Sequence, residues 1–195
     1  MMESFVSRSG IRVTVRPLSK RDVPLMVDLF HHLSPESLYH RFHVPLDHLS
    51  DVEVKRRVRK LAQVDQVNQV ALIALVDGKE GRPTAIAVAR AHRLPGSTEA
   101  EAAVVVRDDF QNQGIGLHLL RRLVNAAVAV GITTFKGYIQ AENWHMLHLL
   151  RKIGLQYTQY IEHAETYVLI QLPAAPLDDV AEPAEARPVA VAAPG

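Results

Sequence analysis

The sequence predicts a mixed α/β protein in which one mostly antiparallel sheet carries helices on both faces. Helical and strand-like periodicities alternate along residues 11–172, and a hydrophobic content of 48% in 195 residues is enough for one sizeable core. One predicted helix links two strands that must then run parallel, which makes the sheet mixed. Residues 173–195 are mainly Ala, Pro, Val and acidic residues without periodicity, so we expect a domain at 1–172 and a disordered tail.

The first part of the chain predicts one strand and three helices. Residues 11–16 alternate apolar and polar side chains, as a half-buried strand does, and Pro17 ends the run. Three helix-start signals follow, each a Ser or Asp in front of a helical apolar stripe. They are Ser19 or Asp22, Ser34 followed by Pro35, and Ser50 or Asp51. The third helix carries many basic residues, and we expect its basic face to be solvated.

The rest of the chain predicts the larger part of the sheet. The β-branched run at residues 102–106 is typical of a strand buried on both faces. The other expected elements are strands at 67–76 and 85–92, a helix after Gly116 that ends at Gly131, a strand at 132–139, a helix from Asn143 to about Ile153, and a hairpin of residues 156–160 and 165–172.

Composition excludes several classes of function. The net charge is +1, so no strong field for nucleic acids or membranes is expected. The sequence has no cysteine, which excludes disulfides, thiolate metal sites and cysteine nucleophiles. The start of the chain lacks the apolar core of a signal peptide, and no apolar run is long enough to span a bilayer. By default we expect a cytoplasmic protein.

A glycine loop at residues 111–116 joins the Val-rich strand to the following helix. Its backbone can approach a ligand closely, and the unpaired N–H groups at the start of the helix suit an anion such as phosphate. The P-loop pattern fails because Leu117 and His118 follow Gly116. The dinucleotide pattern fails because Leu119 occupies the position of the third glycine. An ordinary strand–turn–helix is the alternative to a ligand site.

The pattern Gln-x-x-Gly-x-Gly after a Val-rich strand resembles the pyrophosphate loop of the GNAT superfamily of acyl-CoA-dependent N-acyltransferases. The resemblance extends over residues 11–172 and implies the GNAT fold, with splayed central parallel strands and acetyl-CoA as co-substrate. It implies that amides of the central strand bind the thioester and pantetheine and that loop amides bind the pyrophosphate. The implied cofactor-binding residues are Val104, Val105, Val106, Gln111, Asn112, Gln113, Gly114, Ile115, Gly116, Asn143 and Met146.

Further segments resemble the bacterial Pat-type protein lysine acetyltransferases, which acetylate AMP-forming acyl-CoA synthetases. Residues 34–42 match the second helix of that subgroup, residues 65–75 a strand with its lead-in, and residues 143–147 the coenzyme A helix. The spacing alone leaves open whether Glu99 and Glu101 are solvated residues at a strand end. The resemblance implies that Glu101 is the catalytic base and that the partner is a protein with an acceptor lysine.

Several assignments stay open. Asn143 is an N-cap candidate, and the resemblance implies that it also binds the pantetheine arm. Leu150 stands where many GNAT enzymes have a tyrosine that acts as the general acid and protonates the leaving thiolate. His148 is a weak candidate for that role. The pairs His40 and His43, and His145 and His148, suggest a metal site only with a third ligand, so we expect no metal.

Two other functions compete with protein lysine acetylation. An acidic acceptor pocket would favour a small amine as substrate, whereas an open groove would favour a protein. A non-catalytic acyl-CoA sensor would bind the cofactor without turnover. The sequence leaves the oligomeric state open.

Overall fold

The structure, a computed structural model, describes residues 2–42, 49–65, 68–78, 81–140, 143–162, 165–177 and 189–190. Its strands are β1 (Glu3–Val6), β2 (Arg12–Pro17), β3 (Gln69–Asp77), β4 (Pro83–Arg93), β5 (Glu99–Val106), β6 (Thr134–Ile139), β7 (Tyr157–Glu162), β8 (Glu165–Gln171) and β9 (Val189–Ala190). Its helices are α1 (Val23–His31), α2 (Pro35–Phe42), α3 (Asp51–Ala62), α4 (Ile115–Ala129) and α5 (Trp144–Ile153), with 3-10 turns η1 (Lys20–Asp22) and η3 (Asp108–Phe110).

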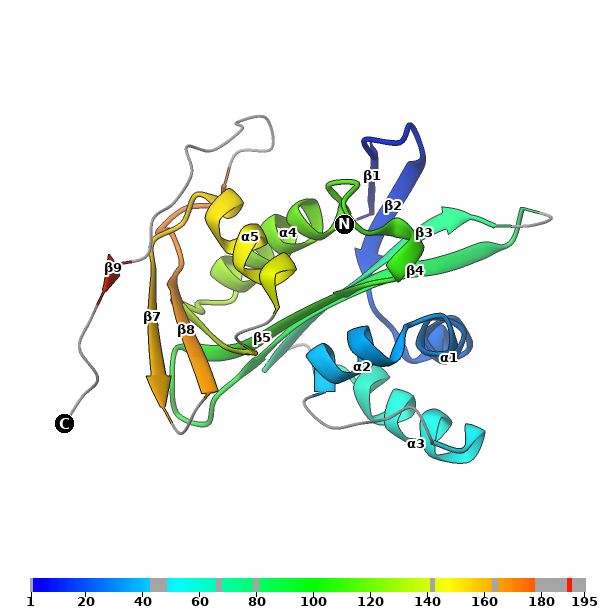
Figure 1. The fold of residues 1–195 in the computed structure, drawn as a ribbon, viewed down its shortest axis with the longest axis horizontal. Helices are drawn as coiled ribbons and strands as arrows, with labels where there is room; N and C mark the ends of the chain where they lie inside the picture. The colour runs from blue at the N-terminus through cyan, green and yellow to red at the C-terminus, as the bar shows by residue number, and fades with distance from the viewer. Residues whose placement is uncertain are drawn as a thin grey trace.

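One sheet forms the centre of the molecule, in the order β1-β2-β3-β4-β5-β6-β8-β7-β9 (Figure 1). The β5–β6 and β7–β9 pairs are parallel and the others are antiparallel. Helices α4 and α5 lie on one side, and α1, α2 and α3 lie on the other (Figure 1). The predicted mixed sheet with helices on both faces is therefore confirmed.

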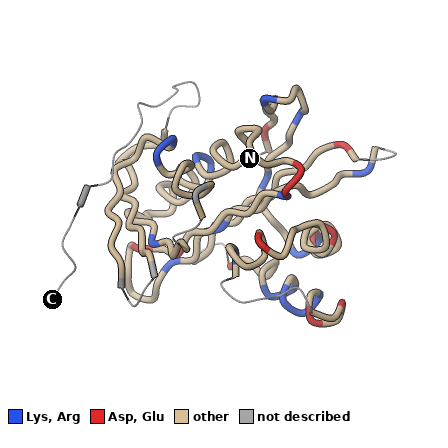
Figure 2. Tube along the Cα trace, in the orientation of Figure 1, with Lys and Arg blue, Asp and Glu red and all other residues tan. Residues whose placement is uncertain are grey.

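Two hydrophobic cores lie on the two faces of the sheet. Leu119 and Leu123 of α4 are fully buried and pack with Phe135 of β6. On the other face, Phe30 of α1 packs with Val58 of α3. Four of the basic residues of α3, Lys55, Arg56, Arg59 and Lys60, are exposed, as predicted for a solvated face, and Arg57 is half-buried (Figure 2).

The predicted helix caps have a structural basis. Ser19 and Asp22 form a capping box at η1, and Ser50 and Glu53 form one at α3. The side chain of each serine accepts a bond from the backbone of the first turn, and the acidic side chain accepts one from the serine N–H. The helix starts predicted from these local signals are therefore confirmed.

Strand β1 is not predicted from the sequence. It is short and partly exposed, and it forms a hairpin with β2. Its anchors are tertiary: Phe5 stacks on His118 with ring centroids 3.7 Å apart, and Glu3 pairs with Arg122 and His118 of α4. These contacts join β1 to α4, so the pattern of the first ten residues alone cannot predict the strand.

The central parallel strands separate along their length. Strands β5 and β6 pair at three positions, the last joining Glu101 to Lys136. Beyond it, β5 stays paired with β4 as far as Val106, and β6 stays paired with β8 as far as Ile139. The splay implied by the resemblance is therefore present. The expectation that residues 102–106 are buried on both faces is wrong, because they are half-buried and line two pockets at the opening.

The beginning of the predicted tail packs on the domain. The Asn125 side chain donates to the Leu177 carbonyl at 3.0 Å and accepts from the Leu177 N–H at 2.6 Å. Residues 178–188 and 191–195 lie outside the described residues, so the disorder expected there stays a prediction. None of the helices in the described ranges has the length and apolarity needed to span a bilayer.

Candidate active site

Two adjoining pockets open where β5 and β6 separate. One, of about 540 Å³, lies toward β6 and β8, and the other, of about 330 Å³, lies toward the glycine loop. Both are lined by His40, Arg41, Val104, Asn143 and Met146. The two pockets therefore form one continuous cleft between α2 and α5, which we call the acceptor pocket (the larger) and the loop pocket (the smaller).

The glycine loop has the backbone geometry that an anion site requires. Gly114 is the N-cap of α4 with φ of 83°, and its carbonyl accepts from the His118 N–H at 3.1 Å. The N–H groups of the first turn of α4 have no acceptor within the helix, and they lie at the positive end of its dipole. A Cβ on Gly116 would stand 3.5 Å from Val106 and 3.8 Å from Leu149, two side chains that also line the loop pocket.

Most predicted cofactor-binding residues lie together in the loop pocket. They are Val104, Val105, Val106, Gln111, Asn112, Gly114, Gly116, Asn143 and Met146. The side chains of Gln113 and Ile115 point elsewhere. Gln113 donates to the Asp109 carbonyl and accepts from Ser9, and Ile115 is buried in the core. These two residues can serve the site only through their backbone amides.

Two cations in the loop pocket were missed from the sequence. Arg8 donates its backbone N–H to the Gln113 carbonyl at 3.1 Å, and its side chain lies beside Gly114. Lys152 of α5 also lines the pocket. Both add positive charge to an anion site. Arg8 comes from a segment with no predicted element, and Lys152 resembles any basic residue in the last turn of a helix, so neither carried a usable signal.

Helix α2 is tied to the start of the glycine loop through Asp108. This carboxylate accepts from the Ser34 N–H at 3.0 Å, from the Ser34 hydroxyl at 2.7 Å and from the Ser37 hydroxyl at 2.8 Å. Gln111 donates to Ser37 and to the Val106 carbonyl. Burial opposes ionisation of Asp108, but the bonds from Ser34 and Ser37 outweigh it and hold the pKa of Asp108 below its usual value.

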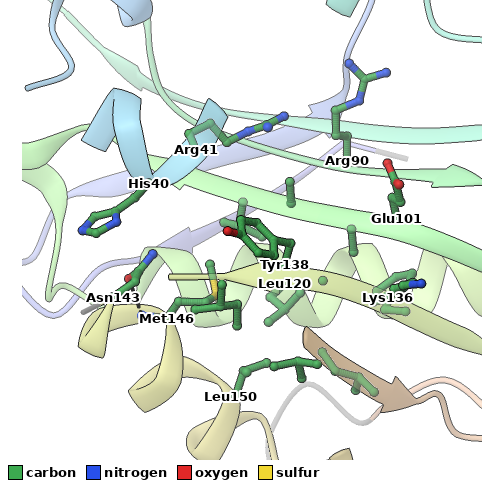
Figure 3. A pocket seen from close by; sticks show the side chains of 18 of the residues that line it. His40, Arg41, Arg90, Glu101, Leu120, Lys136, Tyr138, Asn143, Met146 and Leu150 are labelled. Carbon is green, nitrogen blue, oxygen red and sulfur yellow. Dashed lines mark hydrogen bonds between the residues drawn. The ribbon is translucent and has the colours of Figure 1, made fainter. Parts of the chain in front are cut away.

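Asn143 and Leu150 are the two residues of the predicted coenzyme A helix whose roles the sequence left open. The Asn143 side chain accepts from the Met146 N–H at 3.0 Å, so its N-cap role is present, and it also lines both pockets. Leu150 is 2% exposed and lines the acceptor pocket with an apolar side chain. Tyr138 of β6, which sequence reasoning did not single out, brings a phenol into the same pocket (Figure 3).

Glu101 stands at the point of separation on an open face of the sheet. It is exposed, lines the acceptor pocket, and is in register with His92 of β4 and Lys136 of β6 (Figure 3). The same face continues across β6, β8 and β7 as a ladder of Tyr138, Tyr167 and Tyr160, with successive ring centroids 5.5 and 5.4 Å apart. Helices α1, α2 and α3 lie beneath the β2–β4 half of this face (Figure 1). Glu99 is not among the residues that line the pocket.

The charged side chains that line the acceptor pocket are mainly basic. Arg41, Arg90, Lys136 and two histidines line it, with Glu101 as its carboxylate. Burial, followed by the nearby charge of Arg90, lowers the pKa of Arg41 to about 10. Burial also lowers the pKa of Arg90. Within the described ranges, no group of three potential ligands is placed to hold a metal ion, and His43 lies outside them.

The sequence matches the family profile described as an acetyltransferase (GNAT) domain over residues 12–156. The fold is similar to the GNAT domain of S. lividans PAT, at 28% identity and a TM-score of 0.74, over 88% of this chain and 97% of that one. It is similar to the cAMP-binding acyltransferase from Mycobacterium smegmatis, at 22% identity and a TM-score of 0.59, over 92% of this chain and 50% of that one.

A putative acetyltransferase from Salmonella typhimurium, solved with its cofactor acetyl-CoA, has 18% identity and a TM-score of 0.59, over 87% of this chain and 99% of that one. The likenesses to the Mycobacterium and Salmonella proteins concern the fold alone.

Proposed function

Because this chain belongs to the GNAT acetyltransferase family, we propose that it transfers an acetyl group from acetyl-CoA to a lysine of a protein, with Glu101 as general base. The observation that carries the proposal is the exposure of Glu101 on an open sheet face, at the mouth of the cleft between β5 and β6. A carboxylate there is accessible to a lysine presented by a large partner.

The cleft offers each group that direct acyl transfer needs. The loop pocket would hold the pyrophosphate on the amides of residues 111–116, with Arg8 and Lys152 nearby. The N–H groups of Val104 and Val106 would bind the thioester carbonyl and the pantetheine arm, and Asn143 would bind the arm from α5. Glu101 would take the proton from the acceptor ammonium, so that the amine attacks the thioester carbonyl within a ternary complex. The C–S bond would then break, and coenzyme A would leave as the thiolate and take up a proton from water.

The charge of the acceptor pocket bears on the choice of acceptor. A pocket with Arg41, Arg90 and Lys136 on its walls repels polyamines and other small polycations. The described residues do not form the acidic pocket that would favour such substrates. The similarity to the GNAT domain of S. lividans PAT, together with the resemblance of residues 34–42, supports an AMP-forming acyl-CoA synthetase as the protein partner.

The test is to incubate the protein with acetyl-CoA and an AMP-forming acetyl-CoA synthetase, and to measure acetylation by intact mass. We expect one added acetyl group on the synthetase and a roughly 10²- to 10⁴-fold lower rate for Glu101→Gln, with acetyl-CoA affinity unchanged. Glu99→Gln is the matched control, because Glu99 lies on the same strand outside the pocket.

The outcomes separate the competing functions. Acetyl-CoA binding without transfer to the synthetase or to any lysine peptide would favour a non-catalytic acyl-CoA sensor. Equal rates for Glu101→Gln and the wild type would remove the base assignment and leave the transferase proposal intact. Transfer to small amines alone would replace the protein substrate.

A further inference from the structure

Two arginines in the acceptor pocket lack an anionic partner in the described part of the chain. Arg41 projects from α2, and Arg90 projects from β4 beside it (Figure 3). Arg90 donates to the Gln69 side chain at 2.9 Å and to the Leu61 carbonyl at 3.5 Å, both of which are neutral. The contact recorded for the Arg41 guanidinium is with the Phe42 ring, 4.9 Å from its centroid.

Keeping these charges together is costly without a ligand. Like charges repel, and burial removes part of the hydration that stabilises a guanidinium. The lowered pKa values of Arg41 and Arg90 express that cost. Both arginines also line a small, mostly apolar cavity of about 40 Å³ with residues of α1 and α3, which restricts the freedom of their side chains. A fixed pair of guanidinium forks is suited to bind an oxyanion.

The register of the sheet places this pair close to the reacting centre. Arg90 is opposite Ala103 and Glu101 is opposite His92, so Arg90 and Glu101 are diagonal neighbours on one face. Diagonal residues in an antiparallel pair are about 7–8 Å apart. An extended peptide advances about 3.3 Å per residue, so a side chain two residues from the acceptor lysine can span that separation.

We propose that Arg41 and Arg90 form a subsite for an aspartate or glutamate carboxylate that lies within two residues of the acceptor lysine. The inference rests on the proposed lysine transfer and adds the local sequence that the enzyme selects. Binding of the flanking carboxylate neutralises the arginine pair and aligns the lysine with Glu101. A neutral flank leaves both guanidinium groups unpaired in the complex.

The test uses short peptides with one lysine and either Asp or Asn at each of the four nearest positions. We expect kcat/KM for the best Asp peptide to exceed that of its Asn counterpart by about tenfold or more. In Arg41→Gln and Arg90→Gln, this ratio should fall toward one. In Arg90→Gln, whose side chain lines the acceptor pocket and not the loop pocket, the dissociation constant of acetyl-CoA should stay unchanged. Arg59→Gln, on the exposed side of α3, is the matched control and should keep the full ratio.

Conservative variants separate recognition from folding. Arg41→Lys and Arg90→Lys keep the charge but lose the forked geometry, so each should keep part of the Asp preference. Melting temperatures identify variants that have lost the fold. An Asp preference that survives in both glutamine variants, or equal rates for Asp and Asn peptides in the wild type, would overturn the subsite while leaving the transferase intact.

Three further measurements test other ligands for the arginine pair. A phosphoserine peptide preferred over the Asp peptide would assign the pair to phosphate. A dependence on Arg41 and Arg90 that appears with succinyl-CoA and the Asn peptide would assign the pair to an acidic acyl chain. Weakened acetyl-CoA binding in the glutamine variants would assign it to the cofactor. If the wild type binds acetyl-CoA but acetylates neither the synthetase nor any of the peptides, the proposed lysine transfer itself fails.

Discussion

The two glycines of the loop make different demands, although they are only two residues apart. Gly114 has φ of 83°, a conformation that strains any side chain. Gly116 is helical, and a Cβ there would make ordinary contacts of 3.5 and 3.8 Å. Gly114 allows the left-handed backbone conformation of the loop, and Gly116 leaves the loop pocket open.

Alanine at each position should therefore give opposite results. We expect Gly114→Ala to lower the free energy of unfolding by about 1 kcal/mol. Gly116→Ala should leave stability unchanged or slightly raised, because alanine favours the helix, and it should weaken acetyl-CoA binding by placing a methyl group in the pocket. Denaturant unfolding and calorimetric titration measure the two effects. Tight binding by Gly116→Ala would contradict the assignment of the loop.

A second residue-scale prediction concerns the buried carboxylate of Asp22. Arg16 donates to its two oxygens at 2.8 and 2.6 Å, and Asp22 is 3% exposed. The bond from Arg16 is the largest cause that holds the pKa of Asp22 below its ordinary value of 3.8, followed by those from Ser19 against the opposing effect of burial. The folded state therefore binds this proton less tightly than the unfolded state.

This difference fixes the sign of the pH dependence. The contribution of Asp22 to stability is complete above about pH 5 and is lost as the pH falls through and below 4, where the unfolded state binds more protons. We expect Asp22→Asn to cost about 2–3 kcal/mol at pH 7 and to flatten the stability curve between pH 5 and 2. Asp28→Asn, at a half-exposed position on α1, is the control and should cost much less stability at pH 7.

At the scale of elements, the contact that matters is the one between α2 and the loop. Asp108 accepts three bonds from Ser34 and Ser37, so α2 moves with η3 and the loop pocket. Asp108→Asn offers a single acceptor oxygen, and we expect a loss of about 1–2 kcal/mol in stability and faster amide exchange along α2. Acetyl-CoA affinity should fall with it.

The neighbouring carboxylate provides the control. Asp109 accepts two bonds of 2.6 Å from Arg107 within its own turn and has no recorded bond to α2. Asp109→Asn should therefore leave α2 exchange at the wild-type rate. Equal exchange in the two variants would show that Asp108 does not couple the helix to the loop.

At the scale of the whole molecule, the boundary of the domain is open to measurement. The expected boundary falls after residue 172, whereas Leu177 is bonded to Asn125 and packs against the core. A chain that ends at residue 177 loses only the two-residue strand β9 and should keep most of the melting temperature, whereas one that ends at residue 172 should melt several degrees lower. Asn125→Ala in the full chain should reproduce most of that loss. Equal melting of the two truncated chains would place the boundary at 172.

The sequence by itself determined the helix starts, the strands from β2 to β8 and the glycine loop, because each depends on neighbours within a few residues. Ser19 and Ser50 are examples, since their partners lie three residues away. The GNAT resemblance, carried by the loop and the strand before it, supplied the splay of β5 and β6.

Only the tertiary structure decided which side chains meet. Arg8, Lys152 and the Arg41–Arg90 pair come from separate segments, and no periodicity relates them. The half-burial of residues 102–106 has the same origin, because a β-branched run has the same composition whether a sheet is closed or splayed. Neighbouring residues determine local conformation. The charge and shape of a pocket depend on distant parts of the chain, which come together only in the folded protein.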